Sequence, residues 1–183
     1  MERRFIEESF PIKQVSEESS KEKSIRHGHI STFHIWWARR PLAASRTINY
    51  SSLIEPPHNS EDQKKKLDFI VELSKWHNSH KKKLIEQAKK EILKSNNGKV
   101  PKILDPFAGG GSIPLEALRL GCETYASDYN PVSILILKCI LEYPQKYGES
   151  VINDDGILQK SNNKFLDDIT EWSNWVSSEA KKN

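Results

Sequence analysis

The chain has 183 residues, of which 36% are hydrophobic and 29% charged, and its formal net charge is +3. This composition leaves room for one domain with additional helices, and no apolar run is long enough to cross a bilayer. The start Met-Glu-Arg-Arg-Phe lacks the apolar stretch of a signal peptide, so we expect a cytoplasmic protein without membrane contact. The two cysteines, Cys122 and Cys139, are widely separated, which favours buried thiols over a disulfide or a zinc site.

The first 98 residues are predicted to form a mostly helical region. Pro41 is suited to begin a helix over 42–50, whose small residues allow close packing. Apolar residues then recur at helical spacing and predict a pair of helices between Ser60 and Gly98. Ser60 and Gln63 have the spacing of a capping box at the start of this pair.

Lysine runs at 64–66, 81–83 and 89–90 mark the polar side of the helical pair. They could attract DNA phosphates through a salt-dependent interaction. Lysine on a helix surface is usually a solvated face, however, and we favour that interpretation.

A stronger nucleic-acid candidate lies around the start of helix 42–50. Arg39, Arg40 and Arg46 carry guanidinium groups that bind phosphate bidentately, and the indole of Trp37 can stack on bases. The alternative is that Trp36 and Trp37 are anchors of the hydrophobic core.

Three histidines, His27, His29 and His34, precede this segment and raise the question of a metal site. No acid stands at helical spacing from them and no HExxH pattern is present. We therefore expect exposed or hydrogen-bonded histidines and no metal.

The stretch 100–131 has the order strand, glycine loop, helix, strand, acid. Ile103 and Leu104 belong to a short apolar run that predicts a strand ending near Asp105, and Gly109–Gly111 let the backbone turn and approach a ligand closely. Ser112 is predicted to be the N-cap of the next helix, which Gly121 ends.

A second strand is predicted over 122–127 and brings Asp128 to the carboxyl end of the sheet. In a doubly wound sheet, an acid about 20 residues past the glycine loop accepts hydrogen bonds from ribose hydroxyls. Asn130 and Pro131 then cap and begin another helix towards Pro144, although β-branched residues leave a strand possible there. The tail, 161–183, is predicted to be an amphipathic helix.

Asp105 distinguishes between the cofactors that bind to glycine loops of this kind. A carboxylate at this point would repel the pyrophosphate of a dinucleotide, which disfavours a nucleotide-binding oxidoreductase. S-adenosylmethionine has no phosphate and carries a positive amine and a sulfonium, which an acid stabilises. The pattern therefore favours S-adenosylmethionine.

The segments D-P-F-A-G-G-G-S and S-D-Y-N-P resemble the first cofactor motifs of adenine-specific and related amino-methylating DNA methyltransferases. The segment G-H-I-S-T-F-H-I-W-W-A-R-R-P-L-A-A-S-R, 28–46, resembles the domain of unknown function that opens a group of large adenine-specific DNA methylases. Together with 5–23, the resemblance covers roughly two thirds of the chain. It implies DNA as substrate and attack of an exocyclic base amine on the cofactor methyl.

The resemblance also implies a role for each cofactor residue. Asp105 would receive the methionine amine, the glycine loop would wrap the methionine and ribose, Asp128 would hold the ribose hydroxyls, and Tyr129 would lie against the adenine. Arg39 or Arg40 could pair with the cofactor carboxylate. The full set of cofactor residues is Asp105, Pro106, Phe107, Ala108, Gly109, Gly110, Gly111, Ser112, Asp128, Tyr129 and Asn130.

The catalytic motif of this family is an Asp or Asn, two prolines and an aromatic residue, which hold the amine and stack on the flipped base. No such motif follows Asp128, so we assign no catalytic residue. The nearest string, Glu55-Pro56-Pro57-His58, has a longer acid and no six-membered ring, and it lies before the glycine loop. A circularly ordered enzyme could use it, but a proline-terminated helix end is the preferred interpretation.

The expected fold is α/β: a mostly helical region over 1–98, then the first part of a Rossmann-like methyltransferase domain over 99–183. A complete core of this type has about seven strands, and only about 40 residues follow Pro144. We therefore expect the remaining strands from a missing C-terminal portion or a partner chain. The alternative to an enzyme portion is a non-catalytic remnant or split subunit that binds cofactor or DNA.

Overall fold

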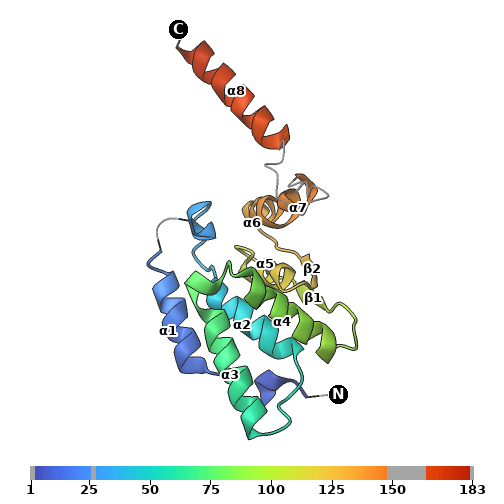
Figure 1. Ribbon diagram of the computed structural model, residues 1–183. Helices are drawn as coiled ribbons and strands as arrows, with labels where there is room; N and C mark the ends of the chain where they lie inside the picture. Colours follow the sequence, from blue (N-terminus) through green and yellow to red (C-terminus); the bar gives the residue numbers. More distant parts are fainter. Residues whose placement is uncertain (1–2, 26–27, 148–163, 182–183) are drawn as a thin grey trace. The chain divides into compact units, whose positions relative to one another are not determined.

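A computed structural model describes residues 3–25, 28–147 and 164–181. Contacts divide the chain into two compact units, Met1–Leu137 and Lys138–Asn183, and each is described by itself. In the described part the structure is mostly helical, and two strands form a small parallel sheet (Figure 1). The mixed helix and strand content agrees with the sequence-based expectation.

Helix α2 (Leu42–Leu53) is the centre of the first unit. It contacts the neighbouring helices α1 (Ile12–Glu22), α3 (Ser60–Ser74), α4 (Lys82–Ser95) and α5 (Ser112–Arg119). Short 3-10 helices lie at Phe5–Glu7, Ile30–Thr32 and Trp76–Asn78. The helix predicted from Pro41 and the helical pair predicted between Ser60 and Gly98 are confirmed.

The start of α3 differs from the prediction by one residue. Asn59, not Ser60, is the N-cap, and its side chain accepts a hydrogen bond from the Asp62 amide at 2.8 Å. The extended backbone of Asn59 places its amide oxygen over the first turn, which is the geometry that an N-cap requires. The end of α4 is as predicted, with Asn97 and Gly98 in positive-φ conformations.

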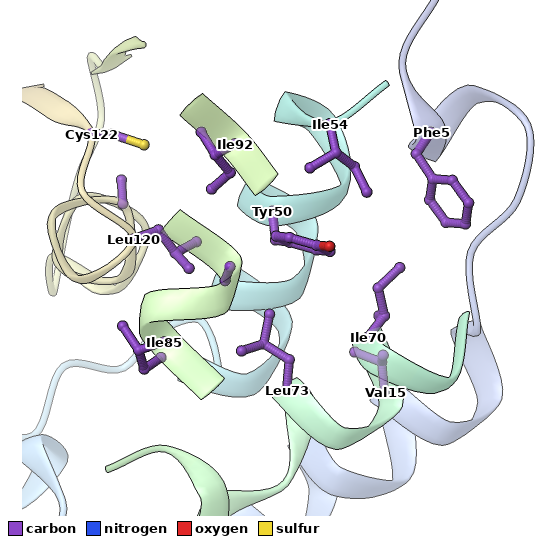
Figure 2. Close-up of a cluster of buried hydrophobic side chains, with 12 residues drawn as sticks. Phe5, Val15, Tyr50, Ile54, Ile70, Leu73, Ile85, Ile92, Leu120 and Cys122 are labelled. Carbon is purple, nitrogen blue, oxygen red and sulfur yellow. The ribbon is translucent and has the colours of Figure 1, made fainter. Parts of the chain in front are cut away.

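The N-terminal helices and the segment after Gly98 contribute side chains to the same hydrophobic core. Figure 2 shows Tyr50 and Ile92 on the same interior as Leu120 and Cys122. The buried side chains that form it are Phe5, Val15, Tyr50, Ile54, Ile70, Leu73, Ile85, Ala88, Ile92, Ala117, Leu120 and Cys122. A domain boundary after residue 98 stays a prediction, since the residues on both sides of it pack together.

A buried carboxylate anchors the segment that precedes α2. Glu22, at the end of α1, accepts hydrogen bonds from His29 Nε2 at 2.7 Å and from the amides of Leu42 at 2.8 Å and Ala43 at 2.9 Å. It therefore caps α2 from another helix, which explains how α2 begins without a side-chain cap at Pro41. His27 lies outside the described residues.

Strands β1 (Lys102–Asp105) and β2 (Glu123–Ala126) run parallel, and α5 connects them. Asp105 pairs with Ala126 in the register, so the two strands end at the same edge. Leu104 and Tyr125 are 68% and 48% exposed on one face of this sheet. Parallel sheets are ordinarily covered on both faces, so this exposed face is unusual.

The chain continues as helix after Asn130, which excludes the strand alternative for this stretch. Helix α6 (Pro131–Leu137) ends the first unit. The second unit holds a π-helical turn over Lys138–Glu142, α7 (Tyr143–Tyr147) and α8 (Lys164–Ala180). The predicted tail helix is thus confirmed within 164–180, while 161–163 lie outside the described residues. None of the helices within the described ranges is long and apolar enough to span a membrane.

Candidate functional site

The site begins where the two strands end. The Ser127 amide donates to the Asp105 carbonyl and the Ala108 amide donates to the Ser127 carbonyl, both at 3.0 Å, so the segments after β1 and β2 are joined. The Asp105 carboxylate accepts a hydrogen bond from the Phe107 amide through Oδ1 at 3.2 Å. A carboxylate has about four acceptor positions, so Asp105 retains capacity for a cationic ligand.

The glycine loop has the conformation that its sequence predicts. Gly109 and Gly111 have φ values of 52° and 75°, in the left-handed region that favours glycine. Gly111 occupies the cap position of α5 without a side-chain cap, so Ser112 is the first helical residue and its predicted role as N-cap is wrong. The helix amides at this end are left for another acceptor.

The Ser112 hydroxyl adds an unsatisfied group at the same place. Ser112 is only 3% exposed, and its oxygen has no hydrogen-bond partner among the described residues. Buried polar atoms nearly always have a partner, so this exception needs an explanation. Ser19, Asn78 and Ser79 have such unpartnered atoms elsewhere in the described residues, so the Ser112 hydroxyl by itself does not mark a ligand site.

Asp128 holds the loop from the β2 side. Its carboxylate accepts hydrogen bonds from the Gly109 amide at 2.7 Å and the Asn130 amide at 2.8 Å. The bond from Asn130 and then that from Gly109 lower the pKa of Asp128 below its ordinary value, because both stabilise the charged form. Ser133 Oγ donates to the Gly109 carbonyl at 2.6 Å. Nothing in the sequence pattern marked Ser133, whose role follows from its place in the first turn of α6.

The structure brings the predicted cofactor residues together at one edge of the sheet. The aromatic rings of Phe107 and Tyr129 are 74% and 94% exposed and are open to a ligand. Pro106 accepts a hydrogen bond from Ser127 Oγ at 3.1 Å, and Ala108 is buried. The segments 105–112 and 128–130 thus form one surface.

A second wall of the site comes from the segment before α2. Arg39 Nη1 donates to the Gly110 carbonyl at 2.9 Å, and Nη2 donates to the His34 carbonyl at 3.2 Å. A Cβ atom at Gly109 would lie 2.8 Å from Trp36 Nε1, and one at Gly110 would lie 3.1 Å from Arg39 Cζ. Burial lowers the pKa of Arg39, because loss of water contact disfavours the charged guanidinium, and the Glu22 carboxylate opposes this shift.

The candidate nucleic-acid residues separate into exposed and buried groups. Trp37 is 79% exposed and stacks on buried Trp36, with ring centroids 4.4 Å apart. Arg40 is exposed and, with Lys23 and Arg39, lines a cavity of about 490 Å³. Trp37 and Arg40 remain exposed to an anionic ligand, whereas both Nη atoms of Arg39 are bound to backbone carbonyls.

Arg46 does not belong to that surface. It is 0% exposed, and its guanidinium donates to the Leu73 carbonyl at 2.8 Å and pairs with Glu116 of α5 at 3.2 Å. Arg119 binds the same Glu116 oxygen at 2.7 Å. The prediction that Arg46 contacts DNA is therefore wrong, because its charge is used inside the core to join α2 to α5.

The glycine loop allows a direct test by substitution. We expect Gly109→Ala to lower the free energy of unfolding by about 2 to 4 kcal/mol, since the new methyl group meets both an unfavourable φ and the buried Trp36 ring. Gly98→Ala is the matched control: it has a φ of 74° but no atom within 4 Å of its added Cβ. We expect this control to lose about 1 to 2 kcal/mol in urea denaturation. Equal losses would contradict the close Trp36 contact.

Comparison with known proteins identifies the family of this chain. The D12 class N6 adenine-specific DNA methyltransferases match residues 80–180, which is more than half of the chain. The chain belongs to this family. A family described only as proteins of unknown function, DUF1156, matches residues 9–78. No curated protein and no solved structure matches the chain.

The two matches confirm the resemblance to adenine-specific DNA methylases that open with a domain of unknown function. Membership in the methyltransferase family implies DNA as the substrate of the class. The residues matched by the unknown-function family include Trp36 and Arg39, which lie against the glycine loop.

Proposed function

We propose that the chain carries the S-adenosylmethionine-binding portion of a DNA methyltransferase that modifies the exocyclic amine of adenine. The observation that carries the proposal is Asp105, a carboxylate at the end of β1 directly ahead of a glycine loop and an uncapped helix. The βαβ unit supports a Rossmann-like core, of which β1 and β2 are adjacent parallel strands. The family supplies the class of reaction.

The groups at the site match S-adenosylmethionine better than a dinucleotide. Asp105 has unused acceptor positions for the methionine amine, and Asp128 lies just after β2, where an acid would accept hydrogen bonds from ribose hydroxyls. The Asp105 carboxylate at the end of β1 would repel a pyrophosphate. When bound, the cofactor supplies an electrophilic methyl group, and the chain's part is to orient it.

DNA would approach over the exposed Trp37 and Arg40, beside Arg39, whose Nη atoms bind the Gly110 and His34 carbonyls. The two guanidinium groups line a cavity that also holds Lys23 and, among the described residues, a single carboxylate, that of Glu22. Positive charge therefore dominates there and fits a phosphate backbone. The lysines of α3 and α4 fit solvent-exposed helix faces better than DNA contacts, since Lys65 and Lys89 pair with acids one helical turn away.

The exposed sheet face fits the proposal that further structure completes the core. Leu104 and Tyr125 would be covered by additional elements of a longer polypeptide or of a partner chain. These elements would also bring the Asp/Asn-Pro-Pro-aromatic motif that does not follow Asp128. The cytoplasmic location stays a prediction.

Titration calorimetry with three ligands tests the cofactor proposal. We expect S-adenosylmethionine and S-adenosylhomocysteine to bind and NAD to give no heat of binding. Transfer of a labelled methyl group to unmethylated DNA is then measured with the chain alone. No Asp/Asn-Pro-Pro-aromatic string follows Asp128 in the printed sequence, so we expect the 183 residues alone to give no transfer. Turnover by the chain alone would contradict our view that the amine-binding motif lies elsewhere, and binding of NAD in place of S-adenosylmethionine would overturn the proposal.

A further inference from the structure

We propose that the segment 33–40, within the region of unknown function, is a clamp that holds the glycine loop in its ligand-binding conformation, with Arg39 as the positioning residue. The inference rests on the proposed cofactor function of the loop and deepens it. It assigns a task to a part of the chain for which the matching family offers none.

The first support is that Arg39 bridges two backbone carbonyls from different segments. Nη1 binds Gly110, 71 residues further along the chain, and Nη2 binds His34 within the clamp itself. The planar guanidinium fixes the direction of each donor, so the Gly110 peptide is oriented relative to the clamp. Arg39 is therefore suited to select one loop conformation.

The second support is steric. Trp36 is 9% exposed and lies so close to Gly109 that this position has no room for a Cβ, while a Cβ at Gly110 would lie 3.2 Å from Trp36 Cβ. Asp128 and Ser133 bind the amide and carbonyl of Gly109. The loop is thus held between two sets of contacts, one from the clamp and one from the segment after β2.

The third support is the anchoring of the clamp at its ends. The buried Glu22 binds His29 on one side of the segment and the first amides of α2 on the other. This triple contact ties the clamp to α1 and α2, which belong to the same packed core as α5. The clamp is therefore a fixed part of the first unit, and its contact with the loop has a rigid support.

The test compares Arg39→Ala with Arg4→Ala in the full chain. Arg4 is the matched control, because its guanidinium also bridges carbonyls of distant segments, Leu53 and Ser95, both at 3.3 Å. Amide hydrogen exchange without ligand is measured at Gly109 and Gly111, whose amides are bonded to Asp128 and to the Ala108 carbonyl. We expect Arg39→Ala to accelerate exchange at these amides about tenfold, and Arg4→Ala to leave it unchanged.

Cofactor affinity and chemical rescue complete the experiment. We expect Arg39→Ala to bind S-adenosylmethionine about tenfold more weakly, with partial recovery on adding millimolar guanidinium and no change in Arg4→Ala. If Arg39→Ala fails to fold, Arg39→Lys replaces it, since one ammonium cannot orient both carbonyls as a planar fork does.

The outcomes separate the clamp from the cofactor proposal. Unchanged loop exchange in the Arg39 variant overturns the clamp, and so does faster exchange with unchanged cofactor affinity. A wild-type chain that binds no S-adenosylmethionine, while its loop exchange still depends on Arg39, overturns the proposed cofactor but leaves the clamp of the loop in place.

Discussion

Replacing Arg46 by alanine is expected to lower the free energy of unfolding by about 3 to 5 kcal/mol, the largest loss among the substitutions considered. The change leaves Glu116, which is 0% exposed, without its buried partner and removes the donor to the Leu73 carbonyl. Burial lowers the pKa of Arg46, while the nearby Glu116 carboxylate raises it and so favours the charged guanidinium. Urea denaturation followed by circular dichroism measures the loss.

Arg119→Ala is the matched control for this prediction. Arg119 binds the same Glu116 oxygen, but its side chain is 26% exposed and water can replace part of its contact. We expect a loss of about 1 kcal/mol. If the two variants lost the same stability, the buried pair would not be the link between α2 and α5 that we describe.

Replacing Asp128 by asparagine is expected to weaken S-adenosylmethionine binding at least about tenfold and to remove a pH response of the loop. An amide has one acceptor oxygen where the carboxylate has two, so it cannot bind Gly109 and Asn130 and also receive both ribose hydroxyls. The affinity is measured by calorimetry at neutral pH.

The sign of the pH response follows from the pKa of Asp128, which is lowered in the folded chain. Its support of the loop is therefore complete above the ordinary aspartate pKa and is lost as the pH falls through the lowered folded value. The nuclear magnetic resonance shift of the Gly109 amide should follow this titration in the wild type and stay flat in Asp128→Asn. A pH-independent amide shift in the wild type would refute the Asp128 contact.

The elements of the site could be predicted because short-range chemistry determines them. A run of apolar residues before three glycines can hardly continue as a strand, and the left-handed backbone at Gly109 and Gly111 is readily accessible only to glycine. Asn130 and Pro131 likewise begin α6 by local capping, with the Asn130 side chain accepting from the Val132 amide at 2.9 Å. For these residues the local sequence is sufficient to predict the local structure.

The contacts of the arginines could not be predicted, because they join segments about 70 residues apart. In the sequence, Arg39 and Arg46 both lie near Trp37 and suggest the same role. In the structure, Arg39 binds the Gly110 carbonyl and Arg46 is buried against Glu116. The difference arises because Arg46 lies on the face of α2 that packs towards α3 and α5. The N-cap of α5 was also predicted at the wrong residue. Gly111 occupies the cap position that we expected the Ser112 side chain to fill.

The most direct test of the central claim is the affinity of S-adenosylmethionine for the wild-type chain and for Asp105→Ala, measured by titration calorimetry under identical conditions. The account predicts that the substitution weakens binding by roughly 10- to 100-fold, since a charge-assisted hydrogen bond to the methionine amine is lost. Asp68→Ala, an exposed aspartate of α3, is the control and should bind as the wild type does. An Asp105→Ala chain that binds S-adenosylmethionine as tightly as the wild type would contradict the account.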